Sequence, residues 1–94
     1  MLNDAVEILS RIKAKITDES DLDWTPFETA EELRKEIDKF IVRLKQRDKK
    51  AMEDINIYFL PTSTFQEHAM QNGWTEEYRE LAERFDKIYE QYKE

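Results

Sequence analysis

The sequence predicts an all-α protein, folded as a small bundle of four to five helices. The chain has 94 residues with one Gly and two Pro, too few for the many turns of a β-sandwich. The remaining composition is rich in Glu, Lys, Ala, Leu and Ile, which favour helices. Apolar residues also recur at alternating steps of three and four, the spacing that places them on one helical face.

The first helix is predicted at residues 3–16. Its apolar face comprises Leu2, Ala5, Leu9, Ile12 and Ile16, which follow the helical spacing. A loop is predicted at 17–28, where Asp18, Glu19, Asp21 and Asp23 interrupt that spacing and Pro26 disfavours helix at the residue before it. The second helix is predicted at 30–48, because Thr29 and Glu32 match a capping box and a strong apolar face follows.

The next element has two interpretations. A helix running from residue 30 to 59 would be about 45 Å long, whereas a compact chain of this length has a radius of gyration of about 12 Å. We therefore predict a break near residues 48–50 and a separate helix at 50–59. The alternative is an α+β fold with a strand at 55–60, since Ile, Tyr and Phe favour strands. That strand would have to pair across chains to satisfy its backbone.

Two further helices are predicted, at 64–72 and 75–93. Thr64 with Glu67, or Ser63 with Gln66, forms a capping box for the first of them. Gly73 follows Asn72 and supplies the left-handed residue that commonly ends a helix. The last helix begins near Thr75 and carries one long apolar face. The whole chain, residues 1–94, is predicted to form a single helical domain.

The composition excludes several kinds of protein. The absence of Cys rules out disulfides and Cys-ligated metals, and no cofactor is expected. The charged N-terminal segment does not resemble a signal peptide. No apolar stretch is long enough to cross a bilayer, so we expect a cytoplasmic protein without a membrane contact. The net charge of -7 opposes non-specific binding to nucleic acid.

Basic residues gather in the middle of the chain. Lys39, Arg43, Arg47 and Lys50 fall at steps of four, four and three, which would place them in one stripe on a helix. Such a stripe can contact phosphates or an acidic partner. The alternative is an ordinary solvated face, whose cations complement the negative end of the helix dipole.

The segment from Ile55 to Thr75, called here the 55–75 window, is nearly free of charge, with Glu67 as its one charged residue. Neutral hydrogen-bonding residues beside aromatic ones are typical of the centre of a recognition surface. The candidate interaction surface therefore comprises Thr62, Ser63, Phe65, Gln66, His68, Asn72 and Trp74. The structural alternative is that these residues cap and end a helix or belong to the core.

His68 is the one histidine of the chain. A zinc site normally needs three or four nitrogen, sulfur or oxygen ligands, and no second His is present. A triad of Ser63, His68 and a carboxylate lacks the sequence that surrounds a nucleophile elbow. The sequence therefore predicts a protein that is not an enzyme.

Three functions follow from these observations. The first is a small acidic protein–protein interaction module, with a homodimer as one version of it. The second is an acidic inhibitor or immunity-type protein that binds a basic partner such as a nuclease, assisted by electrostatic steering. The third, which the overall charge disfavours, is nucleic-acid binding through the basic stripe.

Overall fold

The computed structural model describes residues 2–93, and within this range it contains five α-helices and no strand. The helices are α1 (Leu2–Lys15), α2 (Ala30–Lys45), α3 (Ala51–Tyr58), α4 (Thr64–Asn72) and α5 (Thr75–Lys93). The all-α prediction and all five predicted helices are confirmed. The largest difference in a boundary is at the end of α2, which stops at residue 45 and not at 48.

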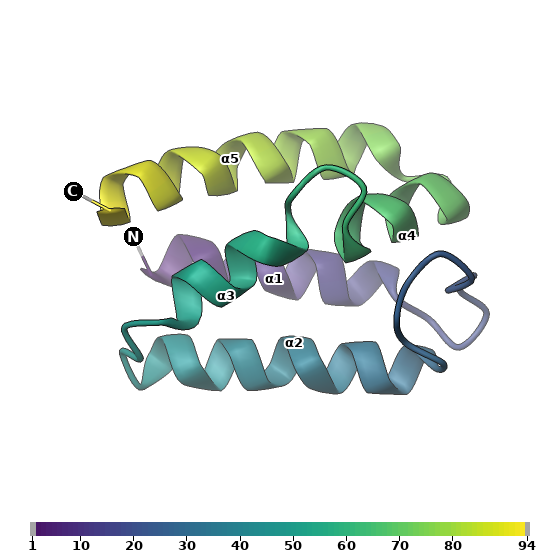
Figure 1. Ribbon diagram of the computed structural model, residues 1–94, viewed down its shortest axis with the longest axis horizontal. Helices are drawn as coiled ribbons and strands as arrows, with labels where there is room; N and C mark the ends of the chain where they lie inside the picture. Colours follow the sequence, from purple (N-terminus) through teal and green to yellow (C-terminus); the bar gives the residue numbers. More distant parts are fainter. Residues whose placement is uncertain (1, 94) are drawn as a thin grey trace.

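The helices form a bundle in which one of four positions is divided between two short helices. Figure 1 shows α5 and α2 on opposite sides, with α1 behind and the α3–α4 pair in front. Helix α1 packs against α2 and α5, and α3 bridges α2 and α5. The turn at residues 59–63 separates α3 from α4. The molecule measures 37 × 24 × 18 Å, with a radius of gyration of 12.5 Å.

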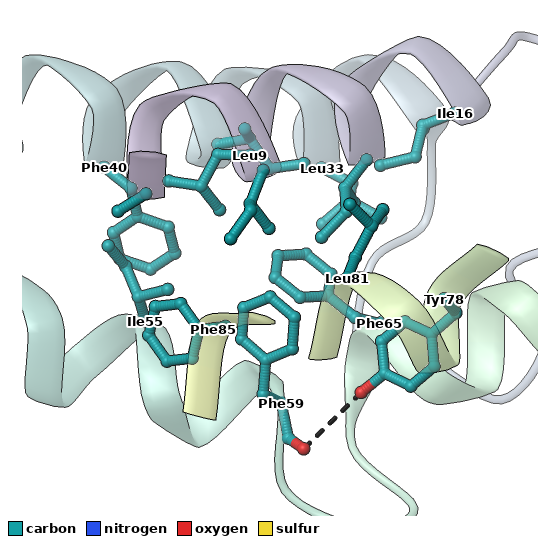
Figure 2. Packing of buried hydrophobic residues seen from close by; sticks show 14 of the residues in the cluster. Leu9, Ile16, Leu33, Phe40, Ile55, Phe59, Phe65, Tyr78, Leu81 and Phe85 are labelled. Atoms are coloured by element: carbon teal, nitrogen blue, oxygen red, sulfur yellow. Dashed lines mark hydrogen bonds between the residues drawn. The ribbon is translucent and has the colours of Figure 1, made fainter. Parts of the chain in front are cut away.

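All five helices contribute to one apolar core, part of which Figure 2 shows from close by. Aromatic rings join α3 and α4 to α5 within it. The Phe59 ring stacks on Phe85 at 4.4 Å between centroids and meets Phe65 edge-on at 5.0 Å. The Tyr78 hydroxyl of α5 donates to the Phe59 carbonyl oxygen at 3.4 Å. These contacts hold the turn between α3 and α4 against α5.

The strand alternative for residues 55–60 is wrong. Residues 51–58 are helical, and Met52, Ile55 and Phe59 are buried together on one face. Their steps of three and four match a helix, whereas a strand would alternate its apolar residues. The backbone bonds of a helix are internal to it, so this segment needs no partner chain to satisfy its backbone.

The ends of α2 and α4 use different capping devices. The Thr29 hydroxyl accepts a hydrogen bond from the Glu32 backbone N–H at 3.1 Å, as the capping box predicts. Gly73 adopts a left-handed conformation with φ of 78° and ends α4, also as predicted. Ser63 is the N-cap residue of α4, although its side chain makes no capping bond. Thr75 is the first residue of α5, where the last helix was predicted to begin.

Replacing Thr29 with alanine is expected to lower the free energy of unfolding by about 1 kcal/mol, because one N–H at the start of α2 loses its acceptor. Chemical denaturation measures the change. Thr29→Ser keeps the hydroxyl and should stay close to wild type. Equal losses for both substitutions would show that the hydroxyl does not stabilise the helix.

Candidate functional site

The predicted interaction surface is divided between the core and the exterior. Phe65, His68 and Trp74 are buried, so they cannot contact a partner in the folded chain. Phe65 and His68 are separated by three positions and share the face of α4 that turns towards the bundle. Trp74 follows the left-handed Gly73, which turns the chain back onto the core. Including these three residues in the exposed surface was wrong.

His68 and Trp74 form a buried hydrogen-bonded pair. The Trp74 Nε1–H donates to the His68 Nδ1 at 3.0 Å, which places the imidazole proton on Nε2 when the ring is neutral. That Nε2 is buried and has no hydrogen-bond partner among the described residues. Burial lowers the pKa of His68 below its ordinary value of 6.5, against a smaller opposing effect of Asp21. The ring is therefore neutral at pH 7.

Asn72 fastens the loop between α1 and α2 to the end of α4. Its side-chain oxygen accepts from the Asp21 N–H at 2.8 Å, and its amide donates to the Asp21 carbonyl oxygen at 2.9 Å. The same amide donates to the His68 carbonyl oxygen at 2.9 Å. With its hydrogen-bonding atoms occupied in this way, Asn72 has a structural role.

Thr62 and Ser63 lie in the turn between α3 and α4, and Gln66 lies in the first turn of α4. Thr62 has a φ of 62°, which is uncommon for a residue other than glycine. Its N–H donates to the Gln66 side-chain oxygen at 2.7 Å, which stabilises this conformation. Thr62 is exposed, and Ser63 and Gln66 are partly exposed. This part of the predicted surface is therefore accessible to a partner.

Three large apolar side chains on α3, in the following turn and on α4 are also exposed. Ile57, Leu60 and Met70 are 55%, 46% and 56% exposed. Leu60 lies one turn beyond Ile57, and Met70 lies one turn beyond Gln66 on α4. We call Ile57, Leu60, Thr62, Gln66 and Met70 the uncharged surface. Its apolar members were not predicted from the sequence, although their positions opposite the core residues of α3 and α4 indicate exposure.

Acidic residues border this surface on the side of α5. A groove of about 250 Å³ runs between the 59–63 turn and α5, and its lining includes Pro61, Gln66, Tyr78, Glu83 and Asp86. Burial raises the pKa of Tyr78 to about 12, with a smaller contribution from Asp86, so its hydroxyl stays protonated. Neither carboxylate forms an ion pair with a described residue. Arg79 is the one cation of the lining.

The basic stripe does not form one helical face. Helix α2 ends before Arg47, which has a φ of 58°, and Lys50 precedes α3. Arg43 donates to Asp48 at 2.8 Å and to Asp54 at 2.7 Å, and its hydrogen bond lowers the pKa of Asp48. Lys39 lies exposed on α2 and forms only a long ion pair, at 4.0 Å from Glu36. The predicted continuous stripe is therefore wrong.

Within residues 2–93, no three His, Asp or Glu side chains come together as metal ligands would. None of the helices in this range combines the length and apolar character needed to span a bilayer. Comparisons with models of protein families, with curated proteins and with solved structures find no match.

Proposed function

We propose that this protein is a protein–protein interaction module that contacts its partner through the uncharged surface. The proposal is based on the exposure of large hydrophobic side chains. Of the five large hydrophobic side chains that are exposed in the described chain, three belong to this surface. They lie in the 55–75 window, where Glu67 is the one charged residue. Interface centres are depleted of charge and enriched in Met; all three side chains are uncharged, and one of them is Met70.

The charges around the uncharged surface favour a basic partner. Residues 51–74 contain three acidic residues and no Lys or Arg, and Asp54 is the acidic one that pairs with Arg43. Glu83 and Asp86 line the adjoining groove. Two copies joined through this surface would bring their acidic borders together, and such contacts between like charges are costly. An inhibitor or immunity-type protein that neutralises a basic partner therefore agrees better with these charges than a homodimer.

A set of charge-introducing substitutions tests the surface. Ile57→Glu, Leu60→Glu and Met70→Glu, combined in one variant, should abolish capture of the partner from a cell extract, because they place carboxylates at the centre of the contact. Val42→Glu is the matched control, since Val42 is also exposed, at 51%, but lies on α2 outside the surface. Circular dichroism should show both variants to be folded.

The captured protein is then purified and titrated by calorimetry at low and high salt. The proposal requires a basic protein that binds wild type and Val42→Glu equally, and whose affinity falls as salt rises. Retention of the same proteins by the triple variant would contradict the proposal. Binding that is indifferent to salt would contradict the choice of a basic partner.

Self-association is the other outcome to measure. Light scattering over a concentration series distinguishes a monomer from a dimer, and the acidic border leads us to expect a monomer. A dimer that the triple variant disrupts and Val42→Glu preserves would show that the surface joins two copies of the chain.

A further inference from the structure

A pocket of about 510 Å³ opens at the end of the bundle where both termini lie. It is bordered by the first turns of α1, the end of α2 with the following loop, and the last turn of α5. Its volume is within the range of small-molecule sites. The pocket shares no residue with the uncharged surface, so a ligand here would be independent of the proposed partner.

Apolar groups form much of the lining. Leu2 and Val6 come from α1, Leu44 from α2 and Tyr92 from α5. The Tyr92 hydroxyl donates to the Lys49 carbonyl oxygen at 2.8 Å, which holds the aromatic ring against the loop that follows α2. An apolar body of a few carbon atoms would therefore meet side chains from three helices.

The charged groups of the lining are predominantly basic. Lys45 and Arg47 line the pocket, and neither forms an ion pair with a described residue. Asp48 is the one acidic residue of the lining, and its carboxylate accepts from Arg43 at 2.8 Å. Two cations without an ion-pair partner in residues 2–93, in a chain whose net charge is -7, make this pocket complementary to an anion.

Arg47 occupies a position at which helices usually place glycine. Its φ is 58°, its N–H donates to the Leu44 carbonyl oxygen and the next N–H donates to the Arg43 carbonyl oxygen, each at 3.0 Å. This is the Schellman arrangement, in which the left-handed residue is most often Gly. An arginine there carries a conformational cost that glycine would avoid, and it places a cation on the pocket.

We propose that this pocket binds a small amphipathic acid, in which one carboxylate is joined to an aliphatic or aromatic body. Lys45 and Arg47 bind the carboxylate, and the apolar lining covers the body. Neither a bare anion nor a neutral molecule of the same shape satisfies both parts of the pocket.

Titration of the full chain with 4-phenylbutyrate, followed by the backbone amide NMR signals, tests this proposal. Saturable shifts are expected at Leu2, Val6 and Leu44. Butyrate keeps the charge without the aromatic body, and 4-phenylbutan-1-ol keeps the body without the charge. Both should bind more weakly than 4-phenylbutyrate. The absence of saturable shifts at these residues, or equal binding of the neutral alcohol, would overturn the proposal.

The variants separate binding from folding. Arg47→Gly removes a cation and relieves the left-handed conformation, so its denaturation midpoint should equal or exceed that of wild type while 4-phenylbutyrate binds about two- to fivefold more weakly. Lys45→Gln should weaken binding by a similar factor, and the double variant should weaken it further. Lys35→Gln makes the same charge change elsewhere on α2 and should bind as wild type does. Wild-type affinity in the double variant would refute the assignment of the two cations.

Discussion

Replacing Phe65 with alanine is expected to lower the free energy of unfolding by about 3–5 kcal/mol. The side chain is fully buried, and its ring centroid lies 5.0 Å from that of Phe59 and 5.3 Å from that of Tyr58. The substitution removes these contacts and leaves a cavity between α3, α4 and α5. Small domains are typically stable by about 5–15 kcal/mol, so this one change would remove a large part of the total.

Urea denaturation measures the effect, with Met70→Ala as the matched control on the same helix. Met70 is more than half exposed, so its loss should change the unfolding free energy by about 0.5 kcal/mol or less. Similar losses for the two variants would show that α4 does not pack through the face that carries Phe65. Comparing Phe65→Ala with Met70→Ala therefore distinguishes the face of α4 that stabilises the fold from the face that we assign to partner binding.

The helices could be predicted from the sequence because local signals and apolar spacing agree for most of them. At Thr29 the capping residue, the first acidic turn and the apolar face of α2 all indicate the same start. The end of α2 was placed three residues too late, because Arg47 adopts a left-handed conformation that glycine usually supplies. No sequence signal marks an arginine in that role. The same residue breaks the basic stripe, whose predicted continuity required a longer helix.

The candidate surface was harder to predict because the 55–75 window contains both core and exterior. A lack of charge is expected of a buried face and of an interface centre alike, so composition does not distinguish Phe65 from Met70. Helical spacing does distinguish them, since Phe65 and His68 share one face of α4 and Met70 lies opposite. The buried pairing of His68 with Trp74 depends on the turn at Gly73, and spacing along a single helix does not reveal it.

Lowering the pH from 7 to 5 is expected to destabilise the protein through His68. The folded state holds the pKa of this residue below 6.5 because the imidazole is buried, whereas the unfolded chain has the ordinary value. Below about pH 6.5 the unfolded state therefore binds more protons than the folded state, and stability falls as the pH falls. Well above that pH, His68 is neutral in both states, so this loss of stability is absent. For one group the slope cannot exceed about 1.4 kcal/mol per pH unit.

The geometry gives the same direction for the effect of acid. In the folded protein the His68 Nδ1 accepts from the Trp74 Nε1–H at 3.0 Å. A protonated imidazole carries hydrogens on both nitrogens, so Nδ1 could no longer accept, and two donors would face each other inside the core. The added charge would also be buried with no hydrogen-bond partner for Nε2 among the described residues. Asp21 exerts a smaller, opposing influence from the loop after α1.

Denaturation curves at several pH values between 7 and 5 measure this effect. His68→Gln is the control, because glutamine keeps a hydrogen-bonding side chain at this position but does not titrate. Wild type should lose stability over this range and His68→Gln should lose markedly less, whatever its stability at pH 7. A Trp24→Phe background restricts the fluorescence to Trp74, whose emission should report the loss of the buried pair. Equal pH slopes in the two proteins would show that His68 does not cause the loss of stability in acid. His68 is the one histidine of the chain, and no other side chain has an ordinary pKa in this range.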